Sequence, residues 1–117
     1  ALDPSTLANG CVHIVPGSHR RGLINPENPS GFLDQDQISS LLEESEPVPV
    51  ELEAGEVVLL HNWLLHSSDI NHTDIPRRAY SVCYMDAATV STRGHEFPVL
   101  FGDGALTVAD CEGRLAQ

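Results

Sequence analysis

Short runs of apolar and β-branched residues, ended by Pro or Gly, dominate the chain before Asp86. Runs of this length and composition, bounded by turn residues, are typical of β-strands. Pro49 suits an edge strand, because proline has no amide to donate to a neighbouring strand. We therefore predict strands at Cys11–Val15, Val48–Leu52, Glu56–Leu60, Leu64–Ser68 and Arg77–Met85.

A single helix interrupts this pattern between Asp34 and Glu46. Its apolar residues recur at helical spacing, an Asp at position 34 or 36 can cap its first turn, and Pro47 closes it. Residues 18–30 are rich in turn-forming residues and read as a loop, and the pattern weakens after Asp86. The sequence thus predicts an all-β sandwich or barrel with one short helix in an insertion.

Composition narrows the range of partners. The net charge is −11, from 6 Lys and Arg against 17 Asp and Glu, so nucleic acids and anionic membranes are unfavourable partners. No apolar stretch approaches the roughly 18 residues of a membrane span, and the first residues do not resemble a signal peptide. We expect a single cytoplasmic domain over residues 1–117, with three reduced cysteines rather than a disulfide framework or a zinc-thiolate site.

Strand alternation places the candidate chemistry. His66 and Ser68 share one face of their predicted strand, and Arg77 shares a face with small residues of the last strand. An Arg at the rim of a pocket lined by small side chains suits a bidentate grip on a carboxylate. Taken alone, a His in a strand is more often a hydrogen-bonded core residue than a metal ligand, and a lone Arg is more often a solvated charge.

The remaining histidines carry weaker signals. His13 and His19 can face a pocket. His61 has the wrong parity to share the face of His66 unless a turn at Asn62-Trp63 intervenes, and we favour for it a structural role or one of supporting a ligand-binding residue. His72 and Asp74 form an H-x-D motif in a polar turn, which we interpret as a chance match.

Together the motifs resemble the phytanoyl-CoA dioxygenase family over about residues 1–86. The stretches that carry the resemblance are Ala1–Asp3 with Asn9–His19, Val48–Glu51 with Ala54–Val58, His61–Ser68 with Asn71, and Arg77–Ser81. The resemblance implies a double-stranded β-helix, the jelly-roll or cupin-like barrel. It also implies Fe(II) and 2-oxoglutarate as cofactors.

The resemblance also assigns roles to residues. His66 matches the C-terminal member of a triad of two His and one carboxylate that binds iron. Arg77 and Ser68 match the residues that bind the distal carboxylate of 2-oxoglutarate. His13, His19 and Trp63 are expected to line the substrate pocket.

In the family, the other two iron ligands form a His-x-Asp pair upstream of the segment that matches Asn9–Cys11. We therefore expect the 117 residues to be the C-terminal part of an incomplete barrel, a fragment of a longer protein whose own activity stays open. Open sheet edges would be covered by pairing with another copy, giving a homo-oligomer.

The favoured function is an oxidoreductase that uses molecular oxygen to hydroxylate a small organic substrate, with halogenation left open. The alternative is a metal-free cupin-like binding or scaffold domain. A carbohydrate-binding jelly-roll is disfavoured by the small number of aromatic residues, two Tyr and one Trp. The loop at residues 20–35 and the tail after Asp86 are expected to contribute to the substrate pocket.

Overall fold

A computed structural model describes residues 1–28 and 32–115 of the chain. The chain forms two compact units, Ala1–Ser81 and Val82–Gln117, and each is described by itself. The predicted substrate loop includes residues 29–31, which lie outside the described residues. The single domain expected over residues 1–117 stays a prediction.

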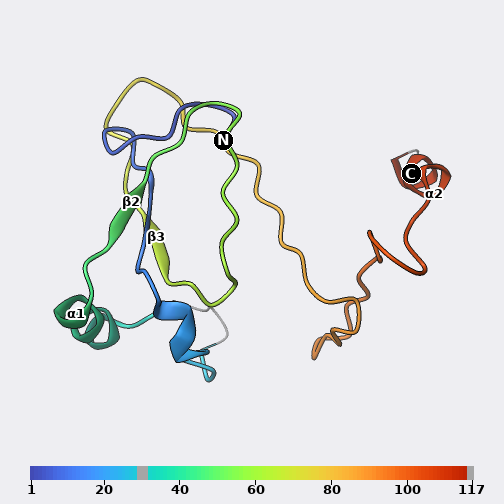
Figure 1. The fold of residues 1–117 in the computed structure, drawn as a ribbon, viewed down its shortest axis with the longest axis horizontal. Coiled ribbons are helices and arrows are strands. Elements are labelled where there is room, and N and C mark those ends of the chain that lie inside the picture. The colour runs from blue at the N-terminus through green and yellow to red at the C-terminus, as the bar shows by residue number, and fades with distance from the viewer. Residues whose placement is uncertain (29–31, 116–117) are drawn as a thin grey trace. The chain divides into compact units, whose positions relative to one another are not determined.

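The first unit is built on a three-stranded antiparallel sheet (Figure 1). β1 (Val12–Ile14) lies at the centre, between β2 (Val48–Val50) and β3 (His66–Ser68). These strands confirm three of the predicted runs, each shorter than expected. An isolated bridge between Ser5 and Leu52 extends the contact between the N-terminal segment and the chain that follows β2.

The register of the sheet decides which side chains share a face. Ile14 lies opposite both Val48 and His66, whereas His13 lies opposite both Pro49 and Ser67. Side chains of directly opposed residues project from the same face of a sheet. One face of the sheet therefore carries Val12, Ile14, Val48, Val50, His66 and Ser68, and the other carries His13, Pro49 and Ser67.

The predicted helix is present as α1 (Gln35–Glu44). Asp34 caps it: its side chain accepts a hydrogen bond from the Gln37 amide, and the Gln37 side chain accepts one from the Asp34 amide, which completes a capping box. The helix ends two residues before the predicted boundary at Glu46. A short 3-10 helix, η1 (Ser18–Arg21), follows β1, and the second unit carries a helix that the sequence pattern did not predict, α2 (Val108–Leu115).

Two of the predicted strands are not formed, so these two predictions are wrong. Residues 56–60 and 77–85 are fully described and form no ladder. A strand needs a neighbour to accept and donate its backbone hydrogen bonds, and Val57 and Leu59 are 89% and 91% exposed. The sheet confirms the β character of the first unit, and the double-stranded β-helix stays a prediction.

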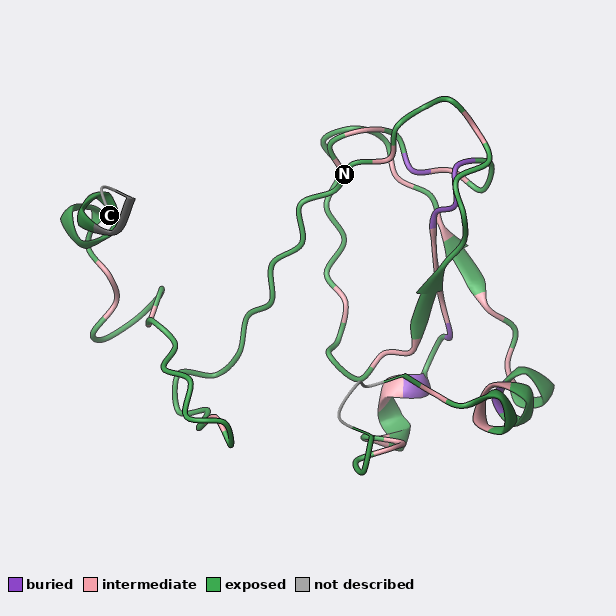
Figure 2. Ribbon diagram, turned by 180° about the vertical axis from the view of Figure 1, so that it is seen from behind, coloured by how far each residue is buried: buried purple, intermediate pink, exposed green. Residues whose placement is uncertain are grey.

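The core of the first unit follows the line of β1 (Figure 2). Cys11 is fully buried and Val15 nearly so, at the two ends of the strand, and Leu41 of α1 is buried as well. The polar side chains of Asn9 and Ser18 are each only 2% exposed, just outside the same two ends. Across the residues that the structure describes, no helix has the length and apolar character required to cross a membrane.

Candidate functional site

His66 opens β3, and its imidazole is oriented by the backbone next to it. The ring Nδ1 lies 2.9 Å from the carbonyl oxygen of Leu64. A carbonyl can only accept a hydrogen bond, so Nδ1 carries the proton and the Nε2 of a neutral ring keeps its lone pair. Such an orienting bond is typical of histidines that bind a metal through the other ring nitrogen. The exposed Nε2 side of His66 is therefore suited to metal binding.

Ser68 lies two residues farther along β3, on the same face as His66. A strand rises roughly 3.4 Å per residue, so the two Cα atoms are about 7 Å apart. Both residues of this exposed strand are accessible to a small ligand. The structure thus brings together the predicted metal ligand and the predicted hydroxyl donor.

Arg77 is held by one end of its guanidinium group. Its Nε donates a hydrogen bond of 3.1 Å to the carbonyl oxygen of Asn9. Arg77 has no further hydrogen bond or ion pair within residues 1–28 and 32–115, so the terminal Nη nitrogens are available for a carboxylate.

These residues follow one another along β1. Arg77 binds Asn9 before the strand begins, Ser68 lies opposite Val12, and His66 lies opposite Ile14. Arginine, serine and histidine therefore lie in this order along β1.

The neighbouring arginine has a different environment. Arg78 donates from Nε and Nη2 to the two carboxylate oxygens of Asp3, at 2.8 and 2.9 Å. Its backbone amide donates to the same carboxylate at 2.8 Å. These bonds lower the pKa of Asp3 from 3.8 to about 2, because they stabilise the charged carboxylate. In the sequence, Asp3 and Asn9 stand out only as parts of motifs, which assign no role to either residue.

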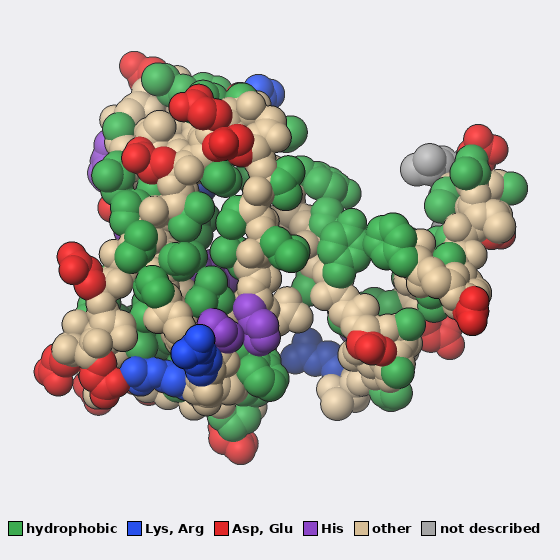
Figure 3. All heavy atoms as spheres, in the orientation of Figure 1, with side chains coloured by type: hydrophobic (Ala, Val, Ile, Leu, Met, Phe, Trp, Pro, Cys, Tyr) green, Lys and Arg blue, Asp and Glu red, His purple; other side chains and the backbone are tan. Residues whose placement is uncertain are grey.

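A cluster of rings lies next to β3. The ring centroids of His19 and His61 are 5.1 Å apart, and those of His61 and Trp63 are 5.8 Å apart. The Trp63 amide donates to Nδ1 of His61, which agrees with the structural role expected for His61. Figure 3 shows histidine side chains gathered beside basic side chains on this face of the first unit.

The ring cluster is tied to the strand that carries His66. The Leu65 amide donates to the hydroxyl of Ser18, and the Val15 amide donates to the carbonyl of Leu65. His19 and Trp63 therefore lie in one cluster with His61 near the start of β3, and their place in a substrate pocket stays a prediction. The buried Nδ1 of His19 has no hydrogen-bond partner among the described residues. His13 lies on the opposite face of the sheet from His66.

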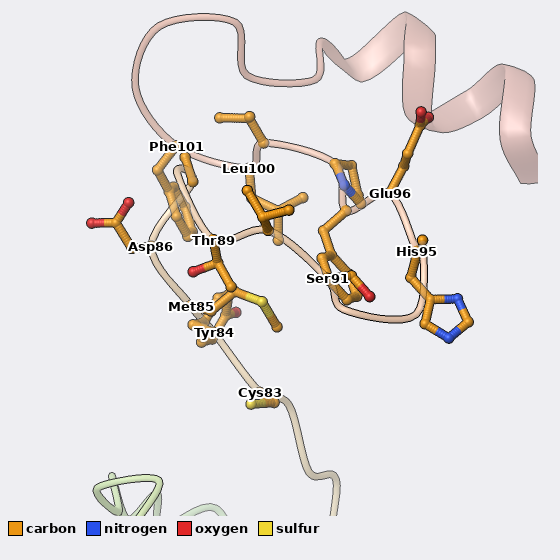
Figure 4. Close-up of a pocket in the computed structure, with 16 residues that line it drawn as sticks. Cys83, Tyr84, Met85, Asp86, Thr89, Ser91, His95, Glu96, Leu100 and Phe101 are labelled. Atoms are coloured by element: carbon orange, nitrogen blue, oxygen red, sulfur yellow. The ribbon is translucent and has the colours of Figure 1, made fainter.

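Each unit of the chain contains a hollow. One, of about 570 Å³, is lined by residues 59–63, including His61 and Trp63 of the ring cluster. The other, of about 990 Å³, lies within the second unit and is lined by residues between Cys83 and Phe101 (Figure 4). In this second hollow the rings of Tyr84 and Phe101 lie 5.9 Å apart.

The H-x-D motif behaves as a turn. The Asn71 side chain accepts from the Thr73 amide and donates to the carbonyl of Ile75, and both His72 and Asp74 are exposed. Across the described part of the chain, no group of three or more His, Cys, Asp or Glu side chains is arranged to hold a metal ion. His66 is thus a single donor of the right chemistry.

Comparison with known proteins identifies relatives. Residues 1–79 match the family described as Phytanoyl-CoA dioxygenase (PhyH). The chain is 38% identical over 98 residues to "Phytanoyl-CoA dioxygenase domain-containing protein 1" of Mus musculus, covering 75% of this chain and 32% of the relative. It is 40% identical over 86 residues to "Phytanoyl-CoA dioxygenase" of Arabidopsis thaliana, covering 70% and 29%.

A bacterial relative, "Methylphosphonate hydroxylase" of Gimesia maris, is 32% identical over 84 residues, covering 72% of this chain and 30% of the relative. The chain thus spans about a third of the length of the curated relatives it matches. No solved structure matches the chain significantly.

Proposed function

Because the chain belongs to the phytanoyl-CoA dioxygenase family, we propose that it carries part of the site of an Fe(II)- and 2-oxoglutarate-dependent dioxygenase that hydroxylates a small organic molecule. The observation that carries the proposal is the hydrogen bond from His66 Nδ1 to the Leu64 carbonyl, which keeps Nε2 free for a metal. The order of Arg77, Ser68 and His66 along β1 adds support.

In this proposal His66 is one of three protein ligands. A neutral imidazole, together with a second histidine and a carboxylate, suits Fe(II) and leaves positions open for other ligands. As the family resemblance implies, the other two ligands would be a His-x-Asp pair upstream of the segment that matches Asn9–Cys11. Bound Fe(II) supplies the reaction with dioxygen, and the part of His66 is to hold the metal at the start of β3.

Arg77 and Ser68 bind the cosubstrate. The terminal nitrogens of Arg77 form paired hydrogen bonds to the distal carboxylate of 2-oxoglutarate, and the hydroxyl of Ser68 donates a further bond. The carbonyl of Asn9 restrains the guanidinium before the ligand arrives, so less side-chain freedom is lost on binding.

The ring cluster forms the substrate end of the site. His19 and Trp63 present an imidazole and an indole ring near the start of β3, beside the hollow at residues 59–63. The exposed edges of β2 and β3 are where further strands of a double-stranded β-helix would pair. His13 projects from the other face of the sheet, and we give it no part in this arrangement.

The test is a binding experiment on the intact protein. We expect anaerobic addition of Fe(II) and 2-oxoglutarate to give the visible charge-transfer band of the chelate. His66→Ala should abolish the band, and Arg77→Ala should weaken 2-oxoglutarate binding while Fe(II) still binds. His72→Ala is the matched control, because it removes another exposed histidine and should leave the band intact. If the intact protein binds no Fe(II), the metal-free scaffold reading replaces the proposal.

A further inference from the structure

The two adjacent arginines have sharply different partners. Both guanidinium groups of Arg77 and Arg78 are chemically able to bind a carboxylate ligand. Asp3 engages Arg78 along its Nε/Nη2 edge with a charged carboxylate, whereas Arg77 is engaged only through Nε, by a neutral backbone carbonyl. Of the two arginines, Arg77 is therefore the one without a carboxylate partner and available to bind a carboxylate ligand.

The partners of both arginines lie in one short segment, residues 3–9. At one end of it, the Asp3 carboxylate binds the Arg78 side chain and amide, while the amides of Leu2 and Asp3 both donate to the Arg78 carbonyl. At the other end, the Asn9 carbonyl accepts from Arg77. The backbone of Arg78 is thus fixed through its amide and its carbonyl.

The segment itself is rigid enough to serve as a reference point. The side-chain oxygen of Asn9 accepts from the Thr6 amide at 2.7 Å, and its side-chain nitrogen donates to the Pro4 carbonyl at 2.8 Å. The Cys11 amide donates to the Thr6 carbonyl, which closes the turn directly before β1. With Asn9 only 2% exposed, its carbonyl is held in place by the turn around it.

We propose that Asp3 is a positioning residue for the 2-oxoglutarate site, acting through Arg78. Asp3 fixes the backbone on which Arg77 stands and occupies the second guanidinium, so that a single arginine meets the distal carboxylate. This inference rests on the proposed function, because it assigns Arg77 to 2-oxoglutarate.

The electrostatics agree with this role. The pKa of Asp3 is depressed by its bonds to Arg78, so the carboxylate stays charged throughout the physiological range. Its side chain is 13% exposed whereas that of Arg78 is 72% exposed. Without a charged Asp3, Arg78 would be a cation without its carboxylate partner next to Arg77, and its bonds to residue 3 would no longer be charge-assisted.

The experiment compares two ligands in the intact protein loaded with Fe(II). One is 2-oxoglutarate and the other is 2-oxopentanoate, which has the same carbon chain without the distal carboxylate. We expect Asp3→Asn to weaken the binding of 2-oxoglutarate by roughly tenfold. This is the lower end of the loss typical when a residue that orients a binding residue is removed. The affinities for 2-oxopentanoate and for Fe(II) should stay within about twofold, because neither involves Arg77.

Further variants keep the test decisive. Arg78→Gln removes the same pair from its exposed side and should reproduce the loss, even if Asp3→Asn fails to fold. The double variant should lose no more than either single variant, since both remove one interaction. Glu44→Gln is the matched control, because it breaks another surface ion pair of the described residues, with Arg21.

The outcomes separate the two levels of inference. If Asp3→Asn weakened the binding of both 2-oxo acids equally, or weakened the binding of Fe(II), Asp3 would only support the fold. That result would overturn the positioning role. The positioning role would also be overturned if Arg77→Ala weakened the binding of 2-oxoglutarate but Asp3→Asn and Arg78→Gln did not. The proposed function would then remain intact. A wild-type protein that binds no 2-oxoglutarate at Fe(II) would refute the proposed function and this inference with it.

Discussion

Replacement of Gly10 by Ala tests a close backbone approach in the first unit. Gly10 lies just before β1 with φ +80°, a conformation that costs other L-residues roughly 1–2 kcal/mol. A Cβ atom at this position would lie 2.4 Å from the Asp69 carbonyl oxygen and 2.9 Å from that of Ile70. Both contacts are to backbone, so neither can be relieved by rotating a side chain.

The chain offers a control that separates the two costs. Gly17 has φ +78°, almost the same conformation, but a Cβ there would have no atom within 4 Å. Gly17→Ala should therefore carry only the conformational cost of roughly 1–2 kcal/mol. Gly10→Ala adds the cost of forcing a methyl group into a packed contact, about 1–3 kcal/mol, for a total of roughly 2–5 kcal/mol.

The assay is urea unfolding of the intact protein and of both variants, with the free energy of unfolding extrapolated to water. The expected result is a destabilisation by Gly10→Ala that exceeds that of Gly17→Ala by about 1–3 kcal/mol, at unchanged denaturant slope. Equal destabilisation by the two variants would refute the reasoning, because it would mean that Gly10 does not abut the segment after β3. The contact matters for the site, since Asp69 directly follows Ser68.

Two further predictions concern buried polar contacts and acid stability. Ser18→Ala should lower the free energy of unfolding by about 1–3 kcal/mol, because it leaves the Leu65 amide without its acceptor, whereas the exposed Ser39→Ala should cost under about 0.5 kcal/mol in the same urea titration. The Asp3 carboxylate, whose pKa falls from 3.8 to about 2, contributes stability that is present above about pH 4 and lost as the pH falls towards 2. The stability difference between wild type and Asp3→Asn should accordingly shrink over that range in pH-dependent unfolding, and a difference that stays constant would contradict it.

Local signals in the sequence predicted the elements that local chemistry determines. Asp34 and Gln37 form the box that starts α1, and the turn at Pro16–Gly17 ends the first strand run. The unpredicted α2 had a comparable signal, because Thr107 and Asp110 exchange hydrogen bonds at its start. The helix was not predicted, because the apolar pattern weakens after Asp86 and the capping residues were not considered.

Non-local structure was less predictable. The runs at residues 56–60 and 77–85 have strand composition, but a ladder depends on a partner strand that composition does not reveal. Alternation correctly placed His66 and Ser68 on one face, since that relation lies within a single strand. It could not place His13 on the opposite face, because that follows from the register between strands.

The distinction between the two arginines was the least accessible from the sequence. Their partners, Asn9 and Asp3, lie 68 and 75 residues away in sequence, and nothing in the Arg-Arg pair itself points to them. Only the folded arrangement shows that one carboxylate satisfies one arginine and leaves the other available.

These contacts divide the proposed site into two halves with separate supports. The segment at residues 3–10 binds Arg78 through Asp3 and Arg77 through Asn9, and at Gly10 its backbone lies close to the chain after Ser68. His66 is instead held at the other end of β1, where the Leu64 carbonyl orients its ring. Since the supports differ, substitutions in the segment at residues 3–10 should weaken the binding of 2-oxoglutarate more than that of Fe(II). Substitutions around the start of β3 should weaken the binding of Fe(II) more.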